Sequence, residues 1–412
     1  MKKRLWLLMF PALICAQDLS SLITSAQKNN QLLKASALQV ASKHKALESQ
    51  KSAYYPTLDV GGAYVTFDKV SAFQPGNTLN LFAKAGVDLF DGFRKSAQVK
   101  QKKSLFQASR YDLAYAKKSL SLDIVHDFYH IKSAQAQLKA LQEKSKQLQA
   151  DIKKVKKFKA AGLASQDYVD KLHAAYEANN YGIESLKFSI KSLKNYLALK
   201  IGTPIDILED ATLLNPTDLA YTPSEAIKSL EKQAQSITQG AKALGSIYYP
   251  QVRLEDTYGY YDYSRDDGLR KFGIEQVDKQ NKLSVVANIR LFDNGSVKKQ
   301  KQALQIQKQA LQQKIDFQKA QEKIRYNLSL EALQTAKLNI QSAQSALKAA
   351  QSVYKSIKAK FNVGIVDQVT YLDALSQKTA SQARFQKAQN DYEIAKADYY
   401  FTANKNIKDY IK

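Results

Sequence analysis

The sequence has little cysteine, proline or glycine: 1, 7 and 15 of its 412 residues, respectively. So few turn-forming residues argue against a large all-β protein and against a disordered linker protein. No apolar run reaches the roughly 20 residues that a membrane-spanning helix needs, so integral membrane helices are not expected. What the sequence does contain in abundance is alanine, lysine, glutamine, leucine and serine, a composition typical of long helices.

Negative charge is also scarce, with 38 acidic residues against 62 basic ones and a formal net charge of +24. Such an excess occurs in proteins that bind nucleic acid or anionic lipid, and on solvated helix faces. The lysines are spread along the whole chain, and no zinc-finger spacing or RNA-binding strand motif is present. We therefore expect no nucleic-acid partner, and a basic nucleic-acid-binding rod is a disfavoured alternative.

Residues 1–16 have the three parts of a secretory signal peptide. Residues 2–4 are basic, residues 5–14 are apolar, and Ala16 supplies a small residue at the cleavage position. Cleavage after Ala16 is favoured over lipidation of Cys15, because the residue before this cysteine is not small. The mature chain is then exported and free of cysteine, which excludes disulfides.

Three landmarks occur twice in the sequence, about 200 residues apart. They are Ala53-Tyr54-Tyr55-Pro56 and Ile247-Tyr248-Tyr249-Pro250, Leu89-Phe90-Asp91-Gly92 and Leu291-Phe292-Asp293-Asn294-Gly295, and Phe158-Lys159-Ala160-Ala161-Gly162-Leu163 and Phe361-Asn362-Val363-Gly364-Ile365. We interpret the chain as a tandem duplication. The first repeat covers residues 17–202, a linker covers 203–222, and the second repeat covers 223–412.

Each repeat contains a predicted β-hairpin, at residues 53–91 and 247–293. Apolar and polar residues alternate along its strands, expected at 57–67, 79–90, 251–261 and 282–291. Runs of about 10–11 residues match tilted transmembrane strands with an apolar outer face and a polar inner face. From the strands alone, ordinary amphipathic hairpins packed on a soluble core are an equally good interpretation.

Long helices with a heptad pattern follow each hairpin. The apolar positions are spaced alternately by four and three residues, as in coiled coils. These positions are Ala134, Leu138, Leu141, Ser145, Leu148, Ile152 and Val155 in the first repeat, and Ala336, Ile340, Ala343, Leu347, Ala350, Tyr354, Ile357 and Phe361 in the second. Residues 296–361 contain no proline or glycine, so one helix of about 100 Å is expected there. Gly162 and Gly364 are predicted to be the turns of two helical hairpins.

Four strands cannot close a barrel, and open sheet edges are not tolerated in lipid, so several chains must contribute strands if these enter a bilayer. The tandem order of Tyr-Pro strand openings, Leu-Phe-Asp-Gly strand exits, long helices and glycine tips resembles the TolC-like outer-membrane efflux protein family. The resemblance covers nearly the whole mature chain. It implies a mainly α fold with a β-barrel portion: a homotrimer with a 12-stranded barrel in outer-membrane lipid, continued by a long periplasmic α-helical barrel.

The resemblance also implies a function without catalysis and without cofactors or metals. Proteins of this kind are the exit duct of a tripartite system, together with a periplasmic adaptor and an inner-membrane pump of the RND or ABC type. Small toxic compounds such as drugs are the favoured substrates, and type I polypeptide secretion is the alternative within the class. The alternative outside it is an exported, soluble coiled-coil protein with a structural or adhesive role.

The family's hairpin tips receive the adaptor, which implies docking residues at both tips here. They are Ala161, Gly162, Leu163, Ala164 and Ser165 in the first repeat, and Val363, Gly364, Ile365 and Val366 in the second. A glycine at such a position also has a purely conformational role, because it supplies the positive φ of a helix end.

The family's periplasmic entrance often carries two aspartates, three residues apart, after the second tip. Here these positions are Thr370 and Asp373, so the resemblance implies one acidic ring from three copies of Asp373. An exposed helical aspartate without such a role is an equally good interpretation. Asp167 stands near the matching position of the first repeat. Val366 replaces an arginine that latches the entrance in similar proteins, which puts that latch in doubt.

Charged residues on the inward strand faces predict the chemistry of the barrel lumen. They are Lys84, Asp88, Arg253, Glu255, Lys282 and Arg290. Four of the six are basic, so a basic lumen is expected, partly offset by Asp88 and Glu255. One further pattern, His126 and His130 at i and i+4, is weak as a zinc site because no other ligands cluster with it.

Overall fold

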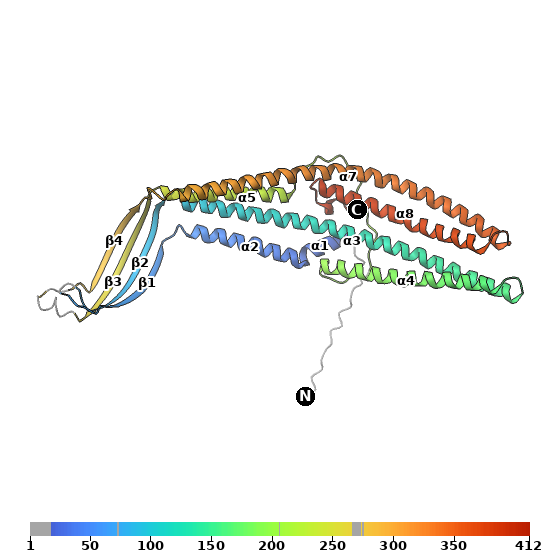
Figure 1. The fold of residues 1–412 in the computed structure, drawn as a ribbon, viewed down its shortest axis with the longest axis horizontal. Helices are drawn as coiled ribbons and strands as arrows, with labels where there is room; N and C mark the ends of the chain where they lie inside the picture. The colour runs from blue at the N-terminus through green and yellow to red at the C-terminus, as the bar shows by residue number, and fades with distance from the viewer. Residues whose placement is uncertain (1–17, 72–73, 206, 266–272, 274–275) are drawn as a thin grey trace, which may run out of the picture. The chain divides into compact units, whose positions relative to one another are not determined.

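The structure is a computed structural model, and it describes residues 18–71, 74–205, 207–265, 273 and 276–412. The expected signal peptide, residues 1–16, lies outside the described residues. The helices are, in chain order, α1 (Leu19–Asn29), α2 (Gln31–Ser52), α3 (Arg94–Ala160), α4 (Gln166–Ile201), α5 (Glu225–Gly245), α7 (Ser296–Asn362) and α8 (Gln368–Thr402), with short 3-10 helices η1 (Ser246–Tyr248) and η2 (Ile407–Tyr410). The strands are β1 (Thr57–Thr66), β2 (Asn77–Asp91), β3 (Gln251–Ser264) and β4 (Lys279–Asn288). In each half of the chain two strands and a long helical hairpin follow one another, preceded by α1 and α2 in the first half and by α5 in the second (Figure 1).

The two longest helices, α3 and α7, have 67 residues each. At 1.5 Å per residue each is about 100 Å long. The helix expected over residues 296–361 is confirmed almost to the residue, because nothing in that segment interrupts the backbone hydrogen bonds. Predicted heptad positions such as Leu148, Val155 and Tyr354 are buried, so the heptad pattern marks the packed faces of these helices.

Contacts divide the chain into two compact units, and each unit contains residues of both halves of the sequence. The first unit comprises the described part of residues 1–37 together with Leu113–Glu225 and Gln318–Lys412. Its larger core contains Phe128, Leu197 and Tyr399, all fully buried or nearly so. A second cluster in this unit contains Leu148, Leu172 and Tyr371 near the helical turns.

The segment between α4 and α5 belongs to the first unit and contains little regular structure. Several of its backbone carbonyls accept hydrogen bonds from tyrosine hydroxyls. Tyr129 donates to Ala211 O at 2.9 Å, Tyr399 to Thr217 O at 3.0 Å, and Tyr400 to Leu214 O at 3.0 Å. Buried carbonyls need partners, so these hydroxyls hold the segment against the helices. α5 then begins at Glu225.

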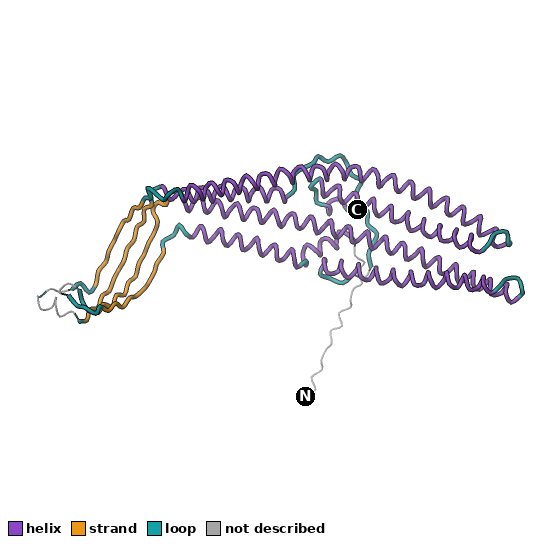
Figure 2. The backbone as a smooth tube through the Cα atoms, in the orientation of Figure 1, coloured by secondary structure: helices purple, strands orange, loops and turns teal. Residues whose placement is uncertain are grey.

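The second unit comprises Leu38–Asp112 and Ala226–Phe317 and contains the whole sheet. The four strands form one antiparallel sheet in the order β1-β2-β3-β4 (Figure 1). The strands are drawn in orange in Figure 2. Ala83 on β2 lies opposite Val60 on β1 and Tyr258 on β3, and Leu254 on β3 lies opposite Val285 on β4. A small apolar cluster of Ile227, Ala234 and Ile315 packs α5 against α7 in this unit.

Candidate functional site

The sheet has one apolar face, because side chains alternate between faces along each strand. The register places on it Leu58, Val60, Tyr64, Leu79, Leu81, Leu254, Tyr258, Tyr260, Leu283 and Val285. Several of these are well exposed: Val60 is 81% exposed and Leu283 is 69% exposed. Asp256, between Ala85 and Leu283, is an acidic exception on this face. An exposed apolar band of this kind is the lipid-facing surface of outer-membrane strands.

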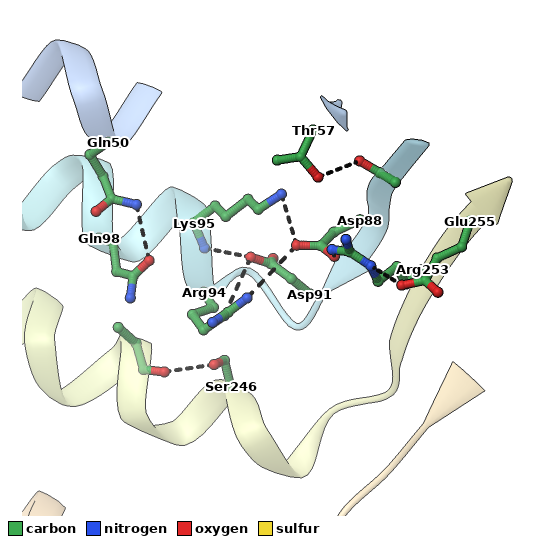
Figure 3. Close-up of polar contacts among 12 residues, drawn as sticks. Gln50, Thr57, Asp88, Asp91, Arg94, Lys95, Gln98, Ser246, Arg253 and Glu255 are labelled. Carbon is green, nitrogen blue, oxygen red and sulfur yellow. Dashed lines mark hydrogen bonds and ion pairs between the residues drawn. The ribbon is translucent and has the colours of Figure 1, made fainter. Parts of the chain in front are cut away.

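The opposite face carries a network of charged side chains (Figure 3). Arg253 on β3 binds Asp88 on β2 at 2.8 Å and Glu255 on its own strand at 2.6 Å. Lys84 binds Glu255 at 2.9 Å. Gly86 makes room for this arrangement, because a Cβ there would lie 2.5 Å from the Arg253 guanidinium. Four of the six residues predicted for the lumen are therefore brought together in one connected network.

Two basic residues that belong to this network were not predicted from the sequence. Buried Lys95 lies 3.0 Å from Asp88, and Arg94 lies 3.8 Å from Asp88 and from Asp91. Both basic residues come from the first turn of α3, and the Asp91 carboxylate accepts the Lys95 backbone N–H at 2.7 Å. The signal was the sequence Asp91-Gly92-Phe93-Arg94-Lys95, which places two basic residues just after a strand that ends in carboxylates.

The structure corrects the placement of Arg290. The alternating pattern predicts a strand over residues 282–291 that includes Arg290, but β4 begins at Lys279 and ends at Asn288. Asn288 pairs with Gln251, the first residue of β3, and Pro250 before it has no N–H to extend the ladder. Arg290 therefore lies past the end of β4.

Lys282 does lie on the charged face, where it pairs in register with Thr257. Asp59 on β1 lies on the same face, opposite Lys84. Without Arg290, the strands carry three basic residues on this face, Lys84, Arg253 and Lys282, against four acidic ones, Asp59, Asp88, Asp91 and Glu255. The excess of positive charge expected for the strands is therefore absent from them.

The two helical turns at Gly162 and Gly364 have the same backbone structure. Both glycines have positive φ, 74° and 78°. Leu163 N donates to Phe158 O at 2.8 Å, and Ile365 N donates to Lys360 O at 2.9 Å. These bonds define the Schellman ending of a helix, in which a left-handed residue lets the chain turn back. The conformational role expected for both glycines is confirmed.

Large apolar side chains at the turns are exposed. Leu163 is 76% exposed, Val363 70% and Ile365 71%. Of the other predicted docking residues, Ala161, Gly162, Ser165 and Gly364 are also exposed, whereas Ala164 and Val366 are half-buried. An exposed apolar cluster at the end of two helical hairpins is the kind of surface that binds another protein.

The two turns are joined to each other by side-chain contacts. Lys154 Nζ donates to Asn362 Oδ1 at 2.7 Å, and Gln368 Nε2 donates to Tyr168 O at 2.7 Å. Beneath them lies the cluster that contains Leu148, Leu172 and Tyr371. The tips of the two hairpins therefore form one surface within the first unit.

Thr370 and Asp373, predicted for the entrance, both lie exposed on the first turns of α8. Asp367 begins this helix, and its carboxylate accepts the Thr370 N–H at 2.7 Å. The hydrogen bond stabilises the carboxylate and lowers the pKa of Asp367. Asp373 lies exposed on the surface of α8.

Asp167 is not the counterpart of Asp373. The residues that begin α4 and α8, Ser165 and Asp367, are 202 positions apart, like the tip glycines. At this offset the first-repeat residue that matches Asp373 is Lys171. Asp167 instead lies in the first turn of α4, where the Ser165 hydroxyl donates to it and lowers its pKa.

A buried polar contact near the tips was not predicted. The Tyr371 hydroxyl on α8 donates to the Asp151 carboxylate on α3 at 2.5 Å. Gln147 Nε2 also donates to this carboxylate at 2.9 Å. Tyr371 is fully buried, and its ring stacks on Phe361 with centroids 4.5 Å apart. Burial and the neighbouring carboxylate strongly raise the pKa of the tyrosine hydroxyl.

The histidine pair does not form a metal centre. His126 Nε2 lies 2.9 Å from Asp398 Oδ1, and its ring meets that of His130 edge-on at 6.4 Å. Within the described residues, no three His, Cys, Asp or Glu side chains are grouped so as to hold a metal ion. No helix among the described residues is both long and apolar enough to cross a membrane.

The fold is that of outer-membrane channels in solved structures. The Campylobacter jejuni CmeC outer membrane channel shares 16% identity over 94% of this chain and 86% of its own, with a TM-score of 0.80. The outer membrane protein VceC of Vibrio cholerae shares 15% identity over 94% and 96%, with a TM-score of 0.78. CusC, described in the context of transmembrane channel formation, shares 15% identity over 95% and 93%, with a TM-score of 0.81. The two-faced sheet and the helical hairpins therefore give the chain the fold of these outer-membrane channels.

The family follows from the sequence itself. Residues 22–188 and 218–402 match the model of the outer membrane efflux protein family, and the chain belongs to this family. Members are pore proteins without enzymatic activity, located in the outer membrane with a helical extension in the periplasm. A search of curated protein sequences found no match.

Proposed function

We propose that the chain works as a homotrimer, whose strands form a 12-stranded barrel in the outer membrane. The observation that carries this proposal is the four-stranded sheet, in which the edge strands β1 and β4 each have one sheet neighbour. Unpaired backbone groups at a sheet edge are not tolerated in lipid, so strands of other chains must pair with these edges. Three copies supply twelve strands, an even number within the range of outer-membrane barrels.

The channel is the passive exit duct of a tripartite efflux system. An inner-membrane pump of the RND or ABC type delivers small toxic compounds, and a periplasmic adaptor connects the pump to the channel. The family's efflux description supports this function over polypeptide secretion. The tip residues around Leu163 and Ile365 receive the adaptor, which their exposure supports. Thr370 and Asp373 line the periplasmic entrance, and three copies of Asp373 form its acidic ring.

Two measurements test the proposal. The protein mass of the complex, extracted from outer membranes in mild detergent and corrected for bound detergent, is expected to be three times that of the mature chain. A deletion strain is expected to accumulate ethidium, and the wild-type gene on a plasmid is expected to reverse this. A monomer or dimer released without detergent contradicts the trimer. Unchanged ethidium accumulation, together with loss of a secreted polypeptide, contradicts small-molecule efflux.

A further inference from the structure

We propose that the hairpin tips bind a partner protein whose docking surface presents aspartate and glutamate side chains around an apolar centre. This inference rests on the proposed function, because it specifies the chemistry of the adaptor surface that meets the tips. It comes from the distribution of charge around the two turns.

Lysines are concentrated where the two long helices end. The last ten residues of α3, 151–160, and the last ten of α7, 353–362, contain eight lysines and a single acidic residue, Asp151. We call these eight lysines the lysine collar: Lys153, Lys154, Lys156, Lys157, Lys159, Lys355, Lys358 and Lys360. All except Lys154 and Lys358 are exposed.

The helix dipole does not account for the collar. Cations stabilise the C-terminal end of a helix, but this effect is confined to about the last turn. Lys153 and Lys156 lie before the last turn of α3, and Lys355 lies before the last turn of α7. Lys153 is also three and four residues from Lys156 and Lys157, spacings at which like charges destabilise a helix. The lysine collar therefore destabilises the helix ends unless negatively charged groups of another molecule lie close to it.

The nearby aspartates do not neutralise it. Across residues 151–173 and 353–373 there are nine lysines and five aspartates. Three of these aspartates are engaged elsewhere: Asp151 with Tyr371, Asp367 with the Thr370 N–H, and Asp167 with Ser165 and Lys171. The surface near the tips keeps a net positive charge.

The collar lies beside an apolar centre, because the two turns directly follow the helix ends that carry the lysines. Leu163, Val363 and Ile365 project from the two turns and are each at least 70% exposed. The contacts of Lys154 with Asn362 and of Gln368 with Tyr168 hold both turns in one surface. An apolar centre inside a charged rim is the anatomy of a protein–protein interface. Three apolar side chains at helix ends do not form the long apolar helix face that lies in a membrane surface. A protein with a complementary acidic rim is the occupant that these features favour.

The full-length chain carrying Leu163→p-benzoylphenylalanine, a photocrosslinking residue, is expressed in the cells that naturally produce the protein. Irradiation then crosslinks the partner to the hairpin tip. The captured protein is then purified, and its Kd for the detergent-solubilised wild-type chain is measured at 50 and 300 mM NaCl. The test variant is Lys156→Glu with Lys157→Glu. The matched control is Lys337→Glu with Lys348→Glu, an equal charge change at exposed positions of α7 away from the tip.

We expect wild-type binding to weaken markedly at the higher salt concentration. The collar variant is expected to bind at least tenfold more weakly at 50 mM NaCl and to lose most of its salt dependence, because attraction between opposite charges at the rim is removed. The control is expected to stay within twofold of wild type. Changing the partner's acidic residues nearest the crosslink to lysine is expected to restore binding to the collar variant.

Four results would overturn the inference: no protein crosslinked from Leu163, wild-type binding that ignores salt, equal loss in the collar and control variants, or collar-dependent binding to phosphatidylglycerol vesicles in place of a protein. Circular dichroism at 222 nm checks that both variants keep their helices. If gene deletion raises ethidium accumulation but binding ignores salt, the efflux function stands and the acidic partner does not. If gene deletion leaves ethidium accumulation unchanged while collar-dependent binding persists, the acidic partner stands and the efflux function does not.

Discussion

The hydroxyl of Tyr371 on α8 donates a 2.5 Å hydrogen bond to the carboxylate of Asp151 on α3, and both residues are buried. The two residues are 220 positions apart in the sequence and belong to different helical hairpins. The bond therefore connects the two hairpins through their shared core, and Tyr371 lies two residues before Asp373 on α8. Breaking it is expected to loosen the packing between them.

Tyr371→Phe should lower the free energy of unfolding of this region by about 1–3 kcal/mol, because it leaves the buried carboxylate without its hydroxyl donor. Thermal unfolding followed at 222 nm measures the change. Tyr181→Phe, at a position that is 78% exposed, is the matched control and should have no effect. A double-mutant cycle with Asp151→Asn should show coupling, and strictly additive effects would contradict a direct interaction.

Alanine should have opposite effects at two glycines of the first hairpin. Gly162 has φ of 74° with nothing near its Cβ position, so Gly162→Ala should destabilise by about 1 kcal/mol through backbone strain alone. Gly182 lies inside α4, where a Cβ would lie 3.6 Å from Leu141 Cδ1, so Gly182→Ala should stabilise by up to about 1 kcal/mol. Melting temperatures of the two variants test this. A loss of stability in Gly182→Ala would show that the helix packing there leaves no room for a methyl group.

The ion pair of His126 with Asp398 should stabilise the fold at acidic pH only. The hydrogen bond to Asp398 raises the pKa of His126, with support from Asp123 and Asp127. A group with a raised folded-state pKa contributes fully below its unfolded pKa of about 6.5, and the contribution is lost as the pH rises through the folded value. His126→Gln should therefore melt below wild type at pH 5.5, and the difference should shrink by pH 8.5. Asp398→Asn should remove the same pH dependence. A difference in melting temperature between wild type and His126→Gln that grows with pH would contradict this explanation.

Adjacent residues of β4 should respond differently to lysine. Val285 lies on the apolar face and is 64% exposed, whereas Ser284 lies on the charged face opposite Glu255. Lysine on the lipid face costs up to about 2–4 kcal/mol near the bilayer centre, so Val285→Lys should reduce the amount of assembled protein in the outer membrane. Ser284→Lys should assemble normally. The measurement is the amount of assembled protein of each variant in outer-membrane fractions. Equal assembly of the two variants would show that the apolar face does not contact lipid.

In the proposed trimer, Asp373→Asn should reduce the preference of the open channel for cations, because three carboxylates at a narrow entrance would attract them. Reversal potentials of single channels in a KCl gradient measure this preference. Asp170→Asn, at another exposed aspartate near the tips, should leave the reversal potential unchanged. If the two variants behave alike, Asp373 is an ordinary surface residue and the entrance lies elsewhere.

Local patterns predicted the long elements well. Residues 296–361 form one helix because no proline or glycine interrupts them, and heptad positions such as Leu148 and Tyr354 are buried. The end of β4 was predicted less well. Alternation shows which residues share a face, but the end of a strand depends on where its partner ends, and Pro250 stops that ladder three residues before the expected position.

Sequence alone determined the duplicated order of elements, the apolar face of the sheet and the positive-φ turns at Gly162 and Gly364, because each depends on residues close together in the chain. Only the tertiary structure decided which distant charges meet. It paired Arg253 with Asp88 across β2 and β3, brought Lys95 to the same carboxylate, and joined Tyr371 to Asp151. Such pairs depend on strand register and helix packing over long separations, and no local period in the sequence encodes them.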